Sequence, residues 1–277
     1  MSNVRSLSRS IRAHKTSSIG RVWLVGAGPG DPELLTVRAH RLLTQCEVLA
    51  YDELVSPEIL AIVPASAERI PVGRRAKGCR HHEDKIHPLV IERALAGRTV
   101  VRLKGGDPMV FGRGGEEAEE LAAHGIPFSI VPGISAALGA AASTGIPLTH
   151  REAASSVTFA TAHASKGDGD PKLAVTLPIT GTIVLYMGLG RIAETVASLI
   201  AAGRAPTMPA AIVASATRPE QRVVIATLET LAEAANQADL RPPALMIIGD
   251  VVARAVQSPS AIDAAAELSA ARTASRG

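Results

Sequence analysis

The sequence predicts an α/β protein made of two α/β domains. Short runs rich in β-branched residues alternate with longer segments of helical spacing, an alternation typical of βαβ units with largely parallel sheets. A length of 277 residues with 47% hydrophobic content is sufficient for two cores. The charged fraction of 20% argues against a largely disordered chain. We therefore expect most of the chain to be packed.

The expected strands fall into two groups. The first half has predicted strands at residues 22–25, 48–51, 99–103 and 128–131. The second half has predicted strands at residues 157–161, 182–187, 210–214, 223–228 and 245–248. An alanine-rich helix over residues 135–143, followed by a stretch with glycine and proline, predicts the crossing between the halves. The domains are therefore expected at 21–134 and 135–254.

A helix is expected immediately after the first glycine-rich loop. Asp31 followed by Pro32 matches an N-cap residue and a first helical position. Apolar residues then recur on one face of that helix, namely Leu35, Ala39, Leu42 and Cys46. The glycine-rich loop is thereby placed between a strand end and a helix start.

The two ends of the chain have the composition of flexible segments. Residues 1–20 are rich in Ser, Arg and Lys, which predicts a disordered basic extension. Residues 255–277 are rich in Ala and Ser, which predicts a flexible tail. Neither segment is assigned a function.

Composition also narrows the partners and the location. The net charge is only +3 and aromatic residues make up 2% of the chain, which disfavours nucleic-acid binding. Cys46 and Cys79 form no C-x-x-C pair, which favours a reducing, cytoplasmic location. Apolar runs are too short to cross a bilayer, and the first segment lacks the apolar middle of a secretory signal. We expect a soluble protein without membrane contact.

Three loops at predicted strand ends are candidates for ligand binding, because ligands bind beyond the carboxyl ends of parallel strands. These loops span residues 26–31, 51–52 and 104–108. The first differs from a dinucleotide-binding loop, since Asp31 occupies the position that needs glycine or alanine and Pro29 lacks an amide donor. A nicotinamide or flavin oxidoreductase stays as an alternative. The sequence contains no P-loop motif.

The loop Gly105-Gly106-Asp107 has two interpretations. Two glycines let a ligand approach the backbone, and a carboxylate accepts hydrogen bonds from ribose hydroxyls or an amine, which suits a cofactor without phosphates. S-adenosylmethionine is such a cofactor. The alternative is a tight turn in which Asp107 caps the following segment.

Several motifs occur in an order that matches one known family. They are VGAGPGD and LLT (25–31 and 34–36), YD (51–52), VRLKGGDP (101–108), FGRGGEE (111–117), VPGI (131–134), STGIPLTHR (143–151) and YMG (186–188). In these residues the chain resembles the tetrapyrrole methylases, and within them the uroporphyrinogen-III C-methyltransferases. The ordered blocks cover about residues 21–252.

The resemblance implies two α/β domains of the tetrapyrrole methylase type, a homodimer, and S-adenosylmethionine in the inter-domain cleft. It implies transfer of two methyl groups to uroporphyrinogen III, at carbons two and seven, giving precorrin-2 and S-adenosylhomocysteine. Ser135 stands where the family often has threonine, which keeps a hydroxyl. By analogy the cofactor-binding residues are Pro29, Gly105, Gly106, Asp107, Val110, Ser135, Ala136, Met187 and Ala216.

Methylation of a ring carbon requires alignment of donor and acceptor and, later, loss of a proton from the macrocycle. A base near the reacting edge is therefore useful. Asp52 matches a position with acid/base function in some family members, and Glu116 is a second candidate base. Glu116 alternatively holds Arg113, the third residue assigned to the catalytic group.

The substrate carries eight carboxylates, so its site should be basic, and arginine binds carboxylates in a bidentate manner. Arg113, Arg151 and Arg74 are the candidates, and the resemblance adds Glu116 and Met187 to the substrate side. Arg74 stands where many relatives have lysine. Because arginine does not exchange protons at neutral pH, we expect it to bind carboxylate.

The basic stretch 74–82 has three interpretations: a solvated loop, a flap over the propionates, or part of a metal site. The metal site would use Cys79, His81, His82 and His87. Their irregular spacing and the single cysteine disfavour it, and we predict no metal.

Two other functions stay open beside the first-step methylase. One is a precorrin methylase that acts at another ring position, and the other is a tetrapyrrole-binding protein without turnover, which Arg74 alone supports. The motifs at 111–116 and 148–151 favour the first-step methylase. Sirohaem, cobalamin and haem d1 pathways all use its product, and we expect no fused oxidase or chelatase segment.

Overall fold

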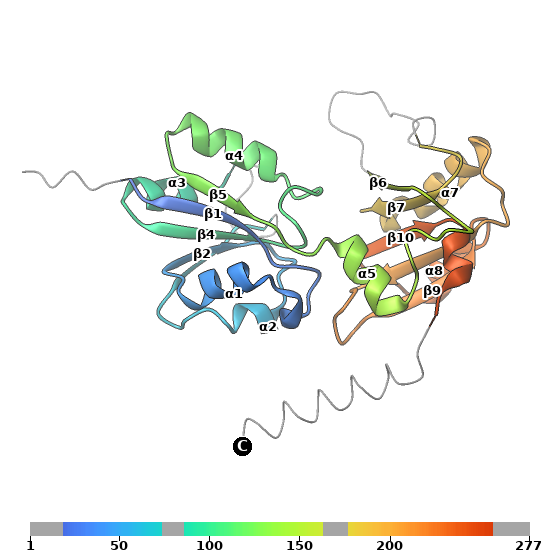
Figure 1. Cartoon of the computed structure of the whole chain (residues 1–277), viewed down its shortest axis with the longest axis horizontal. Coiled ribbons are helices and arrows are strands. Elements are labelled where there is room, and N and C mark those ends of the chain that lie inside the picture. The colour runs from blue at the N-terminus through green and yellow to red at the C-terminus, as the bar shows by residue number, and fades with distance from the viewer. Residues whose placement is uncertain (1–18, 74–85, 163–176, 257–277) are drawn as a thin grey trace, which may run out of the picture.

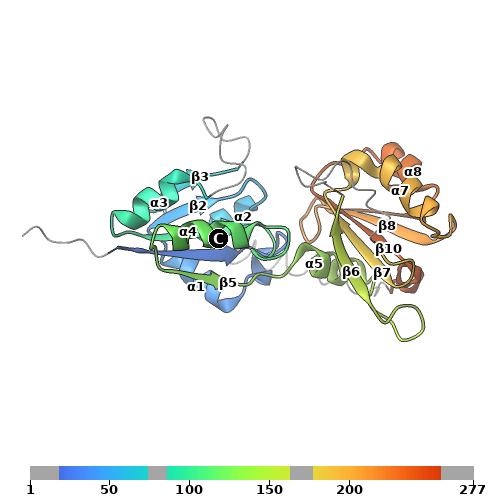
Figure 2. The same ribbon diagram turned by 90° about the horizontal axis from the view of Figure 1, so that it is seen from above.

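The computed structural model describes residues 19–73, 86–162 and 177–256. These residues form two halves, each built on a five-stranded sheet with helices on both faces (Figure 1). The chain passes from one sheet to the other through helix α5 (Ala136–Thr144), which lies at the junction in both views (Figure 2). The predicted α/β class is confirmed for both halves. Most of the predicted terminal segments, 1–20 and 255–277, fall outside the described residues.

The first sheet is entirely parallel, with strand order β3-β2-β4-β1-β5. Helices α1 (Val37–Thr44) and α2 (Pro57–Leu60) pack on one face, and α3 (Pro88–Leu95) and α4 (Gly114–Ala123) pack on the other (Figure 1). All four predicted strands are present. The strands are β1 (Arg21–Gly26), β2 (Val48–Tyr51), β3 (Glu68–Pro71), β4 (Thr99–Lys104) and β5 (Phe128–Val131).

Strand β3 was not predicted. Its sequence, ERIP, contains two charged residues and a proline, and only Ile70 is buried. Proline is tolerated there because β3 lies at the edge of the sheet. A short edge strand of this composition has no alternating apolar pattern to reveal it.

The helix predicted after the first loop is divided in two. Asp31 is the predicted cap, and its side chain accepts a hydrogen bond from Glu33 N at 2.9 Å, but it begins only a short 3-10 turn, η1 (Pro32–Leu34). Thr36 then caps α1 by accepting from Ala39 N at 3.2 Å. The prediction of one continuous helix was wrong because Thr36 is a second N-cap within the same segment.

The second sheet has strand order β6-β7-β10-β8-β9, and only β6 and β7 are parallel neighbours. The prediction of a largely parallel sheet was wrong for this half. Residues 215–221 join β8 to β9 and are too few for a crossover, so β9 must run back beside β8. The strands are β6 (Val157–Thr161), β7 (Thr182–Tyr186), β8 (Pro209–Ala214), β9 (Arg222–Thr227) and β10 (Ala244–Ile248).

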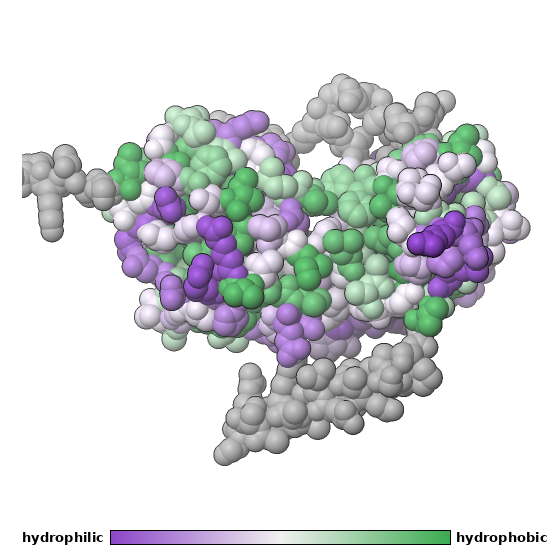
Figure 3. Space-filling view, viewed as in Figure 1, coloured by the Kyte–Doolittle hydropathy of each residue, from purple (hydrophilic) through white to green (hydrophobic). Residues whose placement is uncertain are grey.

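Helical segments also cover both faces of the second sheet. Helix α5 and the 3-10 turn η3 (Asp250–Arg254) pack on one face. Helices α7 (Ile192–Ala201) and α8 (Leu231–Gln237) pack on the other, and the turn η2 (Leu189–Arg191) precedes α7. Among the described residues no helix is both long and apolar enough to cross a membrane. Hydrophilic and apolar residues are interspersed over both halves of the face seen in Figure 3.

Burial of Cys46 gives a testable property of the first core. Its side chain lies in the apolar cluster beneath α1, and burial raises the pKa of the thiol from 9.0 to about 11. We expect iodoacetamide at pH 8.5 to leave Cys46 unmodified in the native protein and to modify it after unfolding in urea, because the thiolate is the reactive form. Peptide mass mapping measures the modification of Cys46 separately from that of Cys79, which lies outside the described residues. Rapid native alkylation of Cys46 would contradict its burial.

Candidate active site

The carboxyl ends of the first sheet face the second half of the molecule (Figure 1). Because all five strands are parallel, the loops that follow β1, β2, β4 and β5 emerge at this one edge. The three predicted ligand-binding loops therefore lie together. The loop after β5 was not one of the three, although Ser135 at its end is a predicted cofactor-binding residue.

Two of these loops are hydrogen-bonded through glycines. Gly28 N donates to Gly106 O at 3.1 Å, and Gly106 N donates to Gly28 O at 2.8 Å. Both residues have left-handed backbones, with φ of 73° and 66°, which glycine adopts without strain. The first and third loops thus form one continuous surface.

The loop after β5 packs against the same surface at van der Waals distance. A Cβ atom on Gly133 would lie 2.2 Å from Gly106 O, and one on Gly26 would lie 2.4 Å from Gly133 N. Neither distance is possible for a real side chain. Glycine at both positions is what allows three backbone segments to meet.

The side chain of Asp107 is hydrogen-bonded to two of these three loops. Its Oδ1 accepts a hydrogen bond from Met109 N at 2.8 Å, which is the capping interaction considered from the sequence. Its Oδ2 accepts from Gly133 N at 3.0 Å and so ties the loop after β4 to the loop after β5. Binding of a cofactor by Asp107 stays a prediction.

The second half contributes Tyr186, the last residue of β7. Its hydroxyl lies 2.6 Å from Ser135 Oγ and accepts a hydrogen bond from Ala137 N at 3.2 Å. Its ring lies 4.7 Å, centroid to centroid, from the ring of Phe111, which belongs to the loop after β4. Burial raises the pKa of the Tyr186 hydroxyl. Tyr186 therefore connects the second sheet with the start of α5 and with the loop after β4 of the first half.

We expect Tyr186→Phe to lower the free energy of unfolding by about 1–3 kcal/mol, because the buried Ser135 hydroxyl and the Ala137 N–H lose a partner. Urea unfolding measures the change. Tyr51→Phe is the matched control, since that ring packs against the core of the first half. Equal losses in the two variants would contradict a specific role for the Tyr186 hydroxyl.

Several predicted cofactor-binding residues lie at this junction. Val110 and Ala136 pack against the apolar cluster that contains Ala216, although Val110 belongs to the first half. Pro29 contacts α5, where a Cβ on Gly139 would meet its ring at 2.6 Å. Residues predicted from distant motifs are thus brought together here.

Five non-glycine residues near the junction have left-handed backbones. A positive φ is uncommon for such residues and tends to occur at functional sites. These residues follow β4, β7 and β8, and two of them, Arg113 and Met187, are predicted binding residues. They are Phe111 (φ 52°), Arg113 (φ 60°), Met187 (φ 57°), Ser215 (φ 49°) and Thr217 (φ 66°).

The loop after β8 also contacts the first half directly. Thr217 Oγ1 accepts a hydrogen bond from Asp31 N at 3.2 Å. Arg218 donates through Nη2 to the carbonyl of Leu54, and its side chain packs over Gly30. The first glycine-rich loop is therefore held from both halves.

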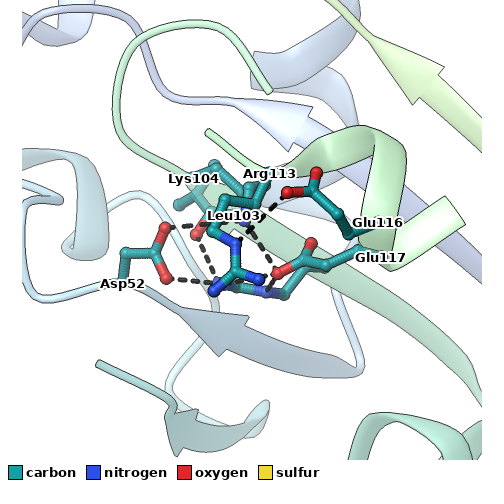
Figure 4. A network of polar contacts seen from close by, with 7 residues as sticks. Asp52, Leu103, Lys104, Arg113, Glu116 and Glu117 are labelled. Carbon is teal, nitrogen blue, oxygen red and sulfur yellow. Dashed lines mark hydrogen bonds and ion pairs between the residues drawn. The ribbon is translucent and has the colours of Figure 1, made fainter. Parts of the chain in front are cut away.

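Asp52, the predicted base, belongs to a network of charged groups (Figure 4). Arg102 Nη2 lies 2.6 Å from Asp52 Oδ1 and 2.9 Å from Glu117 Oε1. Lys104 Nζ lies 2.8 Å from Glu117 Oε1 and 3.9 Å from Asp52 Oδ2. Asp52 and Glu117 lie on opposite sides of this network.

The two cations of the network respond differently to burial. Burial lowers the pKa of Lys104, and the nearby charge of Arg102 lowers it further, while the two carboxylates act in the opposite direction. Burial also acts to lower the pKa of Arg102, but Asp52 and Glu117 outweigh it, so that pKa is raised. Arg102 thus stays charged at any physiological pH.

Arg113 and Glu116, two further predicted residues, pair with each other and are drawn in the same view (Figure 4). Arg113 Nε is 3.4 Å from Glu116 Oε1, in agreement with the alternative in which Glu116 holds Arg113. Arg151 is exposed on the turn between His150 and Ala154. Arg74 lies outside the described residues.

Sequence reasoning missed the roles of Arg102, Lys104 and Glu117. The signal was present, because Arg102 and Lys104 alternate with apolar residues in a strand whose other buried residues are all apolar, and charged residues are rarely buried without partners. Lys104 was read as part of a loop, whereas it is the last residue of β4. His87, from the metal-site alternative, caps α3 by accepting from Leu89 N at 3.3 Å.

Comparison with known proteins agrees with this arrangement. A sequence profile described as Tetrapyrrole (Corrin/Porphyrin) Methylases matches residues 21–232. The siroheme synthase of Azotobacter vinelandii is 47% identical over 248 residues, which are 90% of this chain and 53% of that protein. The chain thus spans about half the length of the curated relatives it matches.

Two solved structures have the same fold. Uroporphyrin-III C-methyl transferase from Thermus thermophilus, complexed with S-adenyl homocysteine, has a TM-score of 0.73 and 43% identity, and the match covers 86% of this chain and 96% of that one. A cobalt precorrin-4 methyltransferase has a TM-score of 0.74 and 27% identity, with 84% and 95% covered. With the profile matched from β1 to α8 and the motif loops gathered at one junction, the protein belongs to the tetrapyrrole (corrin/porphyrin) methylases.

Proposed function

We propose that this protein transfers two methyl groups from S-adenosylmethionine to uroporphyrinogen III, at carbons two and seven, and so forms precorrin-2. The 43% identity to the Thermus uroporphyrin-III enzyme over 86% of the chain carries this proposal. The siroheme synthase relatives support the same substrate. This chain spans only about half of those proteins, so the proposal does not include any activity of their remaining part.

The predicted cofactor-binding residues suit a phosphate-free, cationic donor. Among the nine residues there is one carboxylate, on Asp107, and no cation that would bind a pyrophosphate. A Cβ on Gly106 would meet only Ala136 N, at 3.7 Å, so this backbone has room for a ligand beside it. These features favour S-adenosylmethionine over a nicotinamide dinucleotide.

The proposed site lies between the two halves. Gly105 and Gly106 present their backbone to the donor, while the ring contact between Phe111 and Tyr186 joins the first half to the second. S-adenosylmethionine supplies a methyl group on a cationic sulfur that leaves as a neutral thioether. The protein must align the acceptor carbon and exclude water.

The proton that leaves the macrocycle is assigned to Asp52. Its Oδ1 is bound by Arg102, while among the described residues no cation lies closer to its Oδ2 than Lys104 at 3.9 Å. The exposed fraction of its side chain is 28%, so a substrate can reach it. Arg113 and Arg151, both exposed, are proposed to bind substrate carboxylates, with Met187 lining the site.

The test is anaerobic incubation of the purified full chain with S-adenosylmethionine and uroporphyrinogen III. We expect a product heavier by two methyl groups, detected by mass spectrometry, and two equivalents of S-adenosylhomocysteine. Tight tetrapyrrole binding without consumption of the donor would instead support a binding protein. Retention of NAD or FAD with no donor binding would contradict the proposal.

A precorrin methylase acting at another ring position is the second candidate, because the cobalt precorrin-4 methyltransferase has a comparable TM-score. Its lower identity of 27% makes it the weaker one. Competition decides between them: uroporphyrinogen III should have a kcat/KM at least tenfold above that of a methylated precorrin.

The assembly and the location are proposed on the same resemblance. We propose a homodimer in the cytoplasm, with domains at 21–134 and 135–254. Val223 and Ile225, exposed on one face of the edge strand β9, provide apolar surface for a second copy. Light scattering during gel filtration should give twice the mass of the 28.6 kDa chain.

A further inference from the structure

We propose that Arg102, Lys104 and Glu117 form a buried positioning network that holds Asp52 in one orientation and balances its charge. This inference rests on the proposed function only in giving Asp52 a part in proton removal. The network joins strand β4 and helix α4 to the loop after β2. No role for these three side chains follows from the motifs alone.

The contacts of the network fix one oxygen of Asp52 and leave the other available. Arg102 Nη2 bridges the two carboxylates, at 2.6 Å from Asp52 Oδ1 and 2.9 Å from Glu117 Oε1. Asp52 N also donates to Leu103 O at 3.1 Å, which holds the backbone of this residue beside β4. Oδ2 is beyond hydrogen-bond distance of Lys104 and retains lone pairs for a proton.

The formal charges of the network cancel, because two cations face two carboxylates. Glu117 Oε1 accepts from Arg102 Nε at 3.1 Å, from Arg102 Nη2 at 2.9 Å and from Lys104 Nζ at 2.8 Å. Glu117 therefore neutralises cations that would otherwise act on Asp52 alone. Removing any one member leaves a net charge of known sign beside Asp52.

Burial separates Asp52 from the other members. The exposed fraction of the side chain is 3% for Lys104, 6% for Arg102 and 8% for Glu117, against 28% for Asp52. The interior of the network thus opens to solvent at the carboxylate that is proposed to react. This is the arrangement expected of buried groups that support one reactive group.

Stability alone does not account for such a network. Desolvation of buried charges offsets much of their attraction, and apolar residues of similar volume often stabilise a fold as well or better. Glu117 Oε2 is also buried without a hydrogen-bond partner among the described residues. A buried oxygen without a partner lowers stability, and such a loss is expected where function requires the charged groups.

Other charged groups lie close to Asp52 and must be held constant in a test. Glu53 follows it in the same loop, and Arg218 reaches the carbonyl of Leu54 from the second half. Both are unchanged in the variants below. Differences between variants therefore report on the network.

The direct test follows the ionisation of Asp52 itself. Protein labelled with carbon-13 in its aspartate carboxyls is titrated by NMR, and the Asp52 signal is assigned by its absence in Asp52→Asn. We expect Lys104→Met to move the titration midpoint up and Glu117→Gln to move it down, each by about one to three pH units. Glu119→Gln, on the exposed face of the same helix, should move it by less than about 0.3 units.

Kinetics supply the second measurement. The acid limb of the pH profile of kcat should move to higher pH in Lys104→Met and to lower pH in Glu117→Gln, while KM changes less than threefold. A cation is kept in Lys104→Arg, so this variant should have the acid limb of the wild type. Thermal unfolding and titration with S-adenosylhomocysteine show which variants are folded. A destabilised fold alone would not move the limb in opposite directions.

The outcomes separate this inference from the proposed function. Midpoints that stay within 0.3 units of wild type in both folded variants would overturn the network. Should Glu117→Gln fail to fold, Lys104→Met decides by itself. Opposite shifts in a wild-type background that methylates no tetrapyrrole would support the network and overturn the proposed function.

Discussion

Asp52→Asn is expected to lower kcat for methyl transfer about 100- to 10,000-fold, the range that a positioned base contributes. Asparagine keeps the shape of the side chain and still accepts a hydrogen bond from Arg102, but it does not take up a proton. Affinity for S-adenosylhomocysteine should change less than threefold. Steady-state kinetics and calorimetric titration measure the two quantities.

The matched control for this change is Asp239→Asn. Asp239 is exposed and pairs with Arg241 at 3.1 Å, in the segment between α8 and β10, which contains no predicted site residue. Its kcat should equal that of the wild type. If Asp52→Asn also keeps wild-type kcat, the base must be sought elsewhere, and Glu116→Gln should then show the loss.

Gly133→Ala is expected to abolish binding of S-adenosylhomocysteine and to lower the free energy of unfolding by about 1–3 kcal/mol or more, as overpacking does. The new Cβ would lie 2.2 Å from Gly106 O and 2.8 Å from Gly26 Cα, both of them backbone atoms. One of the three loops must therefore move, and with it the Asp107 contact to Gly133 N. Urea unfolding and calorimetry measure the two effects.

Gly115→Ala is the control for Gly133→Ala. A Cβ at Gly115 would have nothing within 4 Å, and this residue lies in the first turn of α4. We expect a gain of about 0.5–1 kcal/mol in unfolding free energy, since alanine favours the helix, and unchanged ligand affinity. Similar behaviour of the two variants would show that the contact among the three loops is not needed for binding.

The local elements were predictable because their signals lie within short segments. Ser135 directly precedes α5, and the predicted strands of both halves are present within one or two residues of their expected ends. Asp31 caps a helical turn as expected, but Thr36 divides the segment. Where two capping residues lie within one short segment, the sequence indicates a helix without deciding where it begins.

The candidate site was predicted unevenly. Asp52 and the glycine-rich loops were identified through their motifs, and the structure brings these loops into contact. Asp107 accepts hydrogen bonds from backbone amides in two loops. Its motif indicates the local bond from Met109 N but not the bond from Gly133 N. Glu117 belongs to the motif at 111–117, but its role could not be predicted, because nothing local to α4 shows that it faces Arg102.

By itself the sequence determined the α/β class, most strands and helices, the family, and the motif residues from which a site is built. These depend on periodicity, capping and spacing, which act over a few residues at a time. The tertiary structure decided the antiparallel pairing of the second sheet, the contact of Gly133 with Gly106, and the charges around Asp52. Each of these depends on residues far apart in the chain, whose approach is set by how the two sheets bury their apolar faces and by the desolvation of the charges enclosed with them.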